Sequence, residues 1–208
     1  MAISIKTYRT DEDLCGKTHW WGFPDLPDGV EYPVKDGIDS DGFEDTLTFV
    51  CQIRMEDLAP YDTRGLLPHG GILYFFADLD YFLGDMDACA HHLGFWGTDA
   101  FKVIYAPQTD MLFTHRVQWE DGSDACLPAE AMEFNSIADN AYGHKILGAP
   151  YYEEVEAEAP GMISLLQIDE DDDWGLRLFD LGMINFLITP DALSSLDFSS
   201  VRLYFHCL

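Results

Sequence analysis

The nine residues Thr46 to Arg54, TLTFVCQIR, decide the fold class of this sequence. Apolar side chains recur at every second position from Leu47 to Ile53, and the positions between them are mixed in character. A period of two is that of a β-strand, in which successive side chains point to opposite faces. The stretch therefore predicts a strand with one apolar face and one mixed face.

Further strand signals follow along the chain. Four stretches are apolar on both faces, which favours central, buried strands, and a fifth alternates as a half-buried closing strand. Helical signals are few: Met55–Leu58 suggests a single turn, and Thr189 with Pro190 and Asp191 forms a helix start. The buried strands are predicted over 72–79, 101–106, 162–168 and 183–188, and the closing strand over 200–207.

Composition limits the function. The chain has 208 residues, with 11 Lys and Arg against 38 Asp and Glu, and a formal charge of −27. This length predicts one domain, 1–208. Such acidity argues against binding to nucleic acid or to an anionic membrane. A solvated surface, attraction of a basic partner protein and calcium ligation all remain open.

The N-terminus and the cysteines suggest a cytoplasmic protein. The first residues, MAISIKTYRT, lack the apolar core of a signal peptide, and no apolar run approaches the length of a membrane helix. Five cysteines without a CxxC pair are typical of reduced thiols. Cys51 and Cys207 fall within apolar alternation, which indicates core positions.

Metal-binding patterns are weak, and we expect no cofactor. Cys89 and His91, followed by His92, match no established zinc spacing, so we interpret the segment as a polar loop. Two acidic segments invite a calcium interpretation, but neither supplies the ligand positions of an EF-hand loop. These segments, 36–42 and 168–175, are better interpreted as solvated turns. Common nucleotide-binding, zinc-protease, serine-hydrolase and deaminase motifs are absent from the sequence.

Two glutamines interrupt strongly apolar strands. Gln52 and Gln167 must each find hydrogen-bond partners, because an unpaired buried amide costs about 1–3 kcal/mol. Each is followed by an intervening segment, a glycine and another apolar strand, so the half-segments 46–79 and 162–207 are similar. A duplication and chance reuse of strand residues both explain this similarity. Each amide either pins a loop or orients a ligand.

The stretch Thr18–Pro33, THWWGFPDLPDGVEYP, is stiffened by proline and rich in aromatic side chains. Its Pro and Gly residues predict a rigid clamp across the sheet. Trp20 and Trp21 are interpreted either as the edge of the core or as a partner surface, with the core preferred, because exposed aromatic patches are rare without a use.

Several motifs, in this order, resemble those of YwqG-like proteins, a bacterial family of unknown function. They are GFPDLPDGVEYP, LTFVCQIRMEDL, LPHGGILYFFADLD, HKILGAP, LLQIDEDD, DLGMINFLI and DFSSVRLYFHC. Gln52, His144, Gln167 and Asp180 fall on the family pattern. Trp21 departs from it by replacing a glycine, and Asp80–Gly97 looks like an insertion.

The resemblance implies an α+β fold, mostly antiparallel β-sheet with few short helices and interleaved halves. It also implies an accessory or immunity role beside secreted toxins. Together with the acidity, this favours an interaction module that binds a basic effector. The alternative is a small-molecule- or metal-binding enzyme with a scattered polar site around Gln52, Gln167 and His144, with Asp180 as a further ligand candidate.

Overall fold

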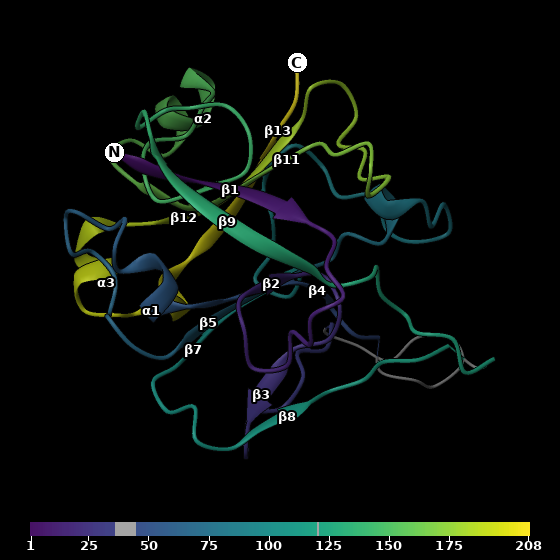
Figure 1. Ribbon diagram of the computed structural model, residues 1–208. Coiled ribbons are helices and arrows are strands. Elements are labelled where there is room, and N and C mark those ends of the chain that lie inside the picture. Colours follow the sequence, from purple (N-terminus) through teal and green to yellow (C-terminus); the bar gives the residue numbers. More distant parts are fainter. Residues whose placement is uncertain (36–44, 120) are drawn as a thin grey trace.

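The computed structural model describes residues 1–35, 45–119 and 121–208. Within them, eleven strands form one antiparallel sheet in the order β6-β13-β12-β11-β10-β1-β9-β2-β4-β5-β7, and β3 and β8 form a separate ribbon (Figure 1). The expected α+β fold, dominated by antiparallel strands, is confirmed. The strands are β1 (Ala2–Tyr8), β2 (His19–Trp20), β3 (Asp25–Pro27), β4 (Thr48–Arg54), β5 (Ile72–Ala77), β6 (Gly94–Phe95), β7 (Phe101–Ala106), β8 (Leu112–Thr114), β9 (Glu130–Ile137), β10 (Lys145–Ile146), β11 (Ile163–Asp169), β12 (Met183–Ile188) and β13 (Arg202–His206).

The described helices are short. Thr189 caps α3, and its side chain accepts a hydrogen bond from the backbone N–H of Ala192 at 3.2 Å, as the helix-start signal predicts. None of the described helices has the length and apolar character needed to cross a membrane. The α-helices are α1 (Met55–Leu58), α2 (Glu153–Glu158) and α3 (Pro190–Ser194), and the 3₁₀-helices are η1 (Tyr81–Leu83) and η2 (Phe198–Ser200).

The sheet has two wings that flank a central pair of strands. The paired strands β1 and β9 lie at its centre, with β10, β11, β12, β13 and the edge strand β6 on one side and β2, β4, β5 and β7 on the other. The sheet curves so that these two wings pack against each other. Phe75 on β5 and Phe186 on β12 meet edge to face, with ring centroids 5.2 Å apart. All side chains of β5 and β12 are buried, which explains why both faces of these strands are apolar.

The two wings share a local geometry around their glutamines. Gln52 on β4 lies opposite His19 on β2, and Gln167 on β11 lies opposite Lys145 on β10. The pairing register shifts two positions before each glutamine, at Val50 in β4 and Leu165 in β11, where the strand bulges against its neighbour.

The chain leaves β2 and β10 in the same way. Trp21 and Leu147 both have positive φ, at 55° and 63°, and each is followed by a glycine of positive φ. The backbone N–H of Trp21 donates to the carbonyl of Val50 at 2.8 Å, and that of Leu147 donates to the carbonyl of Leu165 at 3.2 Å. Each wing therefore turns sharply beside its own bulge.

Two further sequence-based interpretations concern an acidic segment and the cysteines. The acidic segment 36–42 lies outside the described residues. All five cysteines are free; Cys51 is fully buried on β4, and Cys207 is partly exposed after β13.

Candidate functional site

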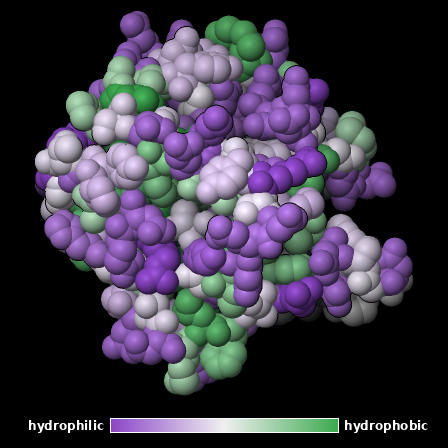
Figure 2. All heavy atoms as spheres, viewed as in Figure 1, coloured by the Kyte–Doolittle hydropathy of each residue, from purple (hydrophilic) through white to green (hydrophobic). Residues whose placement is uncertain are grey.

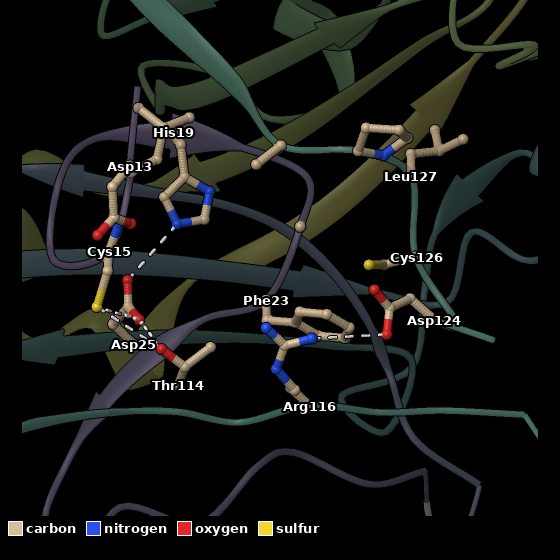
Figure 3. A pocket seen from close by; sticks show the side chains of 14 residues that line it. Asp13, Cys15, His19, Phe23, Asp25, Thr114, Arg116, Asp124, Cys126 and Leu127 are labelled. Carbon is tan, nitrogen blue, oxygen red and sulfur yellow. Dashed lines mark hydrogen bonds and ion pairs between the residues drawn. The ribbon is translucent and has the colours of Figure 1, made fainter. Parts of the chain in front are cut away.

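A cavity of about 510 Å³ opens between the segment before β2, the start of β3, the end of β8 and the segment that leads into β9. Figure 3 shows its two ends. Cys15, His19 and Thr114 gather around Asp25 at one end, and Phe23, Arg116, Asp124 and Cys126 lie at the other.

Asp25 is the centre of the first end. It is 1% exposed, and its backbone N–H donates to Gln52 Oε1 at 2.8 Å. Its Oδ2 accepts hydrogen bonds from the Gly16 N–H at 2.7 Å and from Gln52 Nε2 at 2.8 Å. Its Oδ1 accepts from the Thr114 hydroxyl at 2.6 Å and faces Cys15 Sγ at 3.4 Å. These donors are all neutral groups, so they hold the carboxylate without cancelling its charge.

The protonation of Asp25 follows from these contacts. Burial acts to raise the pKa of the carboxyl, but the nearby imidazole of His19 and the hydrogen bonds from Thr114, Gly16 and Gln52 outweigh it and lower the pKa well below the ordinary value. Asp25 therefore carries a negative charge at neutral pH, close to the cavity wall.

His19 lies beside this carboxylate on β2 and is 2% exposed. Its Nδ1 is 2.7 Å from the carbonyl oxygen of Trp21. Because a carbonyl only accepts, Nδ1 carries the proton of that hydrogen bond. The other ring nitrogen, Nε2, lies 3.8 Å from Asp25 Oδ2, which is longer than a hydrogen bond.

Cys15 is not arranged as an activated nucleophile. The hydrogen bond with Thr114 lowers the pKa of the thiol, but burial and the charges of Asp25 and Asp13 raise it more, so the net pKa lies above the ordinary value. The thiolate is the reactive form of cysteine. The recorded contacts of Cys15 Sγ are with Asp25 and Thr114 rather than with an imidazole base.

A second cavity of about 250 Å³ adjoins the first. The two share Gly22, Phe23, Asp124, Cys126 and Leu127 in their walls, and we refer to the adjoining pair as the joined cavity. Burial raises the pKa of the shared Cys126 thiol to about 11, and the charge of Asp124 adds to the effect. The walls of the second cavity are mainly apolar or aromatic, with carboxylates among them; they include Trp21, Tyr32, Phe49, Asp80, Leu83, Asp85, Val117 and Trp119.

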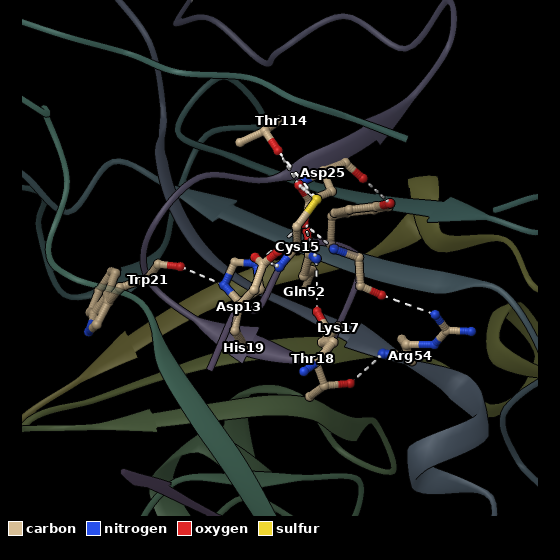
Figure 4. Close-up of polar contacts among 12 residues, drawn as sticks. Asp13, Cys15, Lys17, Thr18, His19, Trp21, Asp25, Gln52, Arg54 and Thr114 are labelled. Carbon is tan, nitrogen blue, oxygen red and sulfur yellow. Dashed lines mark hydrogen bonds and ion pairs between the residues drawn. The ribbon is translucent and has the colours of Figure 1, made fainter. Parts of the chain in front are cut away.

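The two glutamines that the sequence singles out are fully buried and hydrogen-bonded. Besides its contacts with Asp25, Gln52 donates from Nε2 to the carbonyl of Lys17 at 2.9 Å (Figure 4). Gln167 accepts from the Tyr151 N–H at 3.0 Å and donates to the carbonyls of Gly143 at 2.8 Å and Ala141 at 3.3 Å. Neither lines the joined cavity, and Gln52 contributes to it through Asp25.

His144 and Asp180 lie apart from this site. His144 Nδ1 accepts from the Asp169 N–H at 3.1 Å, and its Nε2 lies 3.6 Å from Asp171 Oδ2. Asp180 is exposed, and its carbonyl accepts from the Leu208 N–H at 3.2 Å. The structure therefore does not bring Gln52, Gln167, His144 and Asp180 together around one cavity.

The tryptophan pair belongs to the core. Trp20 and Trp21 are 0% and 1% exposed, and Trp20 stacks on Trp174 with ring centroids 5.2 Å apart. Burial of this kind leaves neither ring available as a partner surface. Trp21 also forms part of the wall of the smaller cavity.

Cys89 and His91 are separated by their contacts. Cys89 is exposed, whereas His91 stacks on Trp96 at 4.3 Å and places Nε2 2.8 Å from Asp78 Oδ2. Among the residues that the structure describes, no group of three or more His, Cys, Asp or Glu side chains is arranged to hold a metal ion.

Sequence reasoning did not select Cys15, His19, Asp25 or Thr114. The requirement that Gln52 find partners was the available signal, because it predicts a polar group beside β4. It does not identify Asp25, which lies 27 positions before Gln52, or Thr114, which lies 89 positions after Asp25.

Comparison with known proteins places the chain in a family. A search of curated proteins found no match. The family described as "Domain of unknown function (DUF1963)" matches residues 20–207, which include Asp25, Gln52 and Thr114. Over nearly its whole length, therefore, the chain belongs to the DUF1963 family.

Proposed function

We propose that this protein is a cytoplasmic, YwqG-like interaction module that binds a basic effector protein, as an accessory or immunity factor. In this proposal the joined cavity receives a cationic group of the partner, and Asp25 supplies the negative charge that attracts it.

The state of Asp25 carries the proposal. The carboxylate is ionised, nearly inaccessible to water and held by neutral donors, and His19 is the basic side chain recorded close to it. A charge in a poorly solvated site acts over a longer distance than the same charge in water. The cavity beside it is therefore a favourable place for a positive group.

The composition supports the same class of partner. With a formal charge of −27, the chain attracts basic proteins and raises the rate at which they associate with it. Figure 2 shows that the visible face is largely hydrophilic, with one group of apolar side chains at the end where β3 and β8 lie in Figure 1 and further groups towards the opposite end.

The contacts of the other candidates favour binding over catalysis. Gln52 and Gln167 use their amides to hold backbone groups, and both ring nitrogens of His144 face internal partners. The raised pKa of Cys15 keeps its sulfur in the thiol form. We therefore rank an enzyme built around these residues below the interaction module.

Calorimetric titration of the full-length protein with an oligolysine peptide tests this function. We expect saturable binding at about 20 mM salt that weakens at about 150 mM salt, because screening reduces the attraction. Asp25→Asn and Asp124→Asn should each weaken binding by about threefold or more. Asp191→Asn, an equal charge change on α3, should leave it almost unchanged.

Equal affinities for the three variants would show that the peptide senses only the overall charge, which contradicts a site at the cavity. Failure of the wild-type protein to bind at low salt would also overturn the proposal. Asp124 has a side chain that is 46% exposed, so Asp124→Asn keeps the test informative even where Asp25→Asn reduces stability.

A further inference from the structure

The junction of the two cavities already holds a cationic side chain from the protein itself. The Cζ atom of Arg116 lies over the ring of Phe23, 5.3 Å from its centroid, and Nη1 lies 3.8 Å from Asp124 Oδ1 (Figure 3). Phe23 and Asp124 belong to the walls of both cavities. A guanidinium group thus rests on an aromatic face beside a carboxylate, where the two cavities meet.

Arg116 is held weakly in this position. The side chains of Arg116 and Asp124 are 63% and 46% exposed, and their separation is longer than a hydrogen bond. Exposed ion pairs of this kind add little to stability, and a cation on an aromatic face in water adds a similarly small amount. Another cation of the same shape can therefore replace Arg116 at low cost.

The surroundings suit a guanidinium better than an ammonium group. Beside Phe23, the smaller cavity presents Phe49 and Trp119 together with the carboxylate of Asp85. The carboxylate of Asp80, also in this wall, is already held by Lys35 at 2.9 Å and Thr48 at 2.6 Å. A planar guanidinium stacks on aromatic rings and donates paired hydrogen bonds to carboxylates, whereas a lysine ammonium is compact and strongly hydrated.

We infer that the joined cavity is an arginine-binding site, at which a partner's arginine side chain displaces Arg116 from Phe23 and Asp124. The inference rests on the proposed function, and it specifies the group that the basic partner presents. Arg116 then acts as an internal competitor, so its removal should tighten binding.

A matched control is present elsewhere in the chain. Arg202 on β13 lies over Phe95 with its Cζ 3.5 Å from the ring centroid. Neither Arg202 nor Phe95 lines the joined cavity. Arg116→Gln and Arg202→Gln therefore change the net charge equally and each remove an arginine from an aromatic ring, but only the first frees the proposed site.

Fluorescence titrations with oligoarginine and oligolysine peptides of equal length test the inference. The wild-type protein should bind oligoarginine about two- to fivefold more tightly than oligolysine, and Phe23→Ala should reduce this preference. Arg116→Gln should tighten the binding of oligoarginine by a similar factor relative to Arg202→Gln.

Equal tightening in Arg116→Gln and Arg202→Gln would overturn the inference, because a general change in charge would then explain it. Equal wild-type affinities for the two peptides would also overturn it. If Asp25→Asn and Asp124→Asn still weaken the binding of both peptides in that case, the proposal of an interaction module is retained, but its cavity does not select arginine. Absence of binding by either peptide contradicts the interaction module itself.

Discussion

Gln52 and Gln167 hold their neighbouring loops through the same pair of contacts. Gln52 Oε1 accepts the N–H of Asp25 at 2.8 Å, and Gln167 Oε1 accepts the N–H of Tyr151 at 3.0 Å. Each Nε2 donates to a carbonyl that lies just before the short strand paired with the glutamine's own strand. For Gln52 this is the Lys17 carbonyl before β2, at 2.9 Å, and for Gln167 the Gly143 carbonyl before β10, at 2.8 Å. Each amide thus links the chain before a short strand to the chain after it.

Replacing either glutamine should therefore be costly. Gln52→Leu and Gln167→Leu should each lower the free energy of unfolding by about 2–4 kcal/mol, because buried backbone groups lose their hydrogen-bond partners. Urea denaturation of the two variants measures the effect. Gln108→Leu, at an exposed position after β7, serves as the control and should change stability by less than about 0.5 kcal/mol.

The pair also tests the similarity between segments 46–79 and 162–207. If the two wings derive from one duplicated segment, the two glutamines perform the same structural task, and Gln52→Leu and Gln167→Leu should lower the free energy of unfolding by similar amounts. A large loss at one position with almost none at the other would contradict equivalent roles.

Gly22 and Gly148 should tolerate no side chain. Their φ angles are +75° and +98°, and an added Cβ would lie 2.7 Å from Ala129 Cβ or 2.4 Å from the carbonyl oxygen of Asp139. We expect Gly22→Ala and Gly148→Ala each to lower the free energy of unfolding by about 3 kcal/mol or more, since steric overlap adds to the strain of a left-handed backbone. Thermal unfolding of each variant measures the loss.

Gly29→Ala separates the two contributions. Gly29 has φ of +78°, but an added Cβ would have nothing within 4 Å, so this variant reports backbone strain alone. Gly29→Ala should lower the free energy of unfolding by about 1–2 kcal/mol. A loss at Gly29 as large as that at Gly22 would show that close packing against Ala129 is not important.

Local patterns explain which strands the sequence predicted. The strands β7 and β12 have the predicted bounds, Phe101–Ala106 and Met183–Ile188, because each is a largely apolar run that is followed at once by Pro107 or by the helix start at Thr189. The central strand β9, Glu130–Ile137, was missed, since most of its residues are polar or partly exposed and its alternation is weak. The helix α2, Glu153–Glu158, was missed because only Val155 is buried in it.

The site was harder to predict than the sheet. Thr114 meets Asp25 because β8 pairs with β3 in the register Asp25 opposite Thr114, and nothing in either three-residue strand specifies its partner. The low accessibility of Trp20 and Trp21 agrees with their preferred interpretation as core residues. Residues with strong apolar character were thus easier to place than the polar groups brought together by distant pairing.

The low pKa of Asp25 makes a specific prediction about acid stability. Burial opposes ionisation, but the hydrogen bonds to the carboxylate outweigh it, so the folded state binds the proton more weakly than the unfolded state does. The stabilisation is fully present above the ordinary carboxyl pKa of about 4. It is lost progressively as the pH falls below that value towards the lower pKa of the folded state.

Asp25→Asn should therefore lower stability by about 2–4 kcal/mol at neutral pH, because the amide also places a donor against the donors that surround it. The difference from wild type should narrow as the pH falls from about 5 to about 2, since the wild-type carboxylate alone loses its contribution there. Urea denaturation across this range provides the comparison, with Asp191→Asn as the exposed control. A difference that stays constant with pH would mean that Asp25 stabilises the fold through packing and not through its charge.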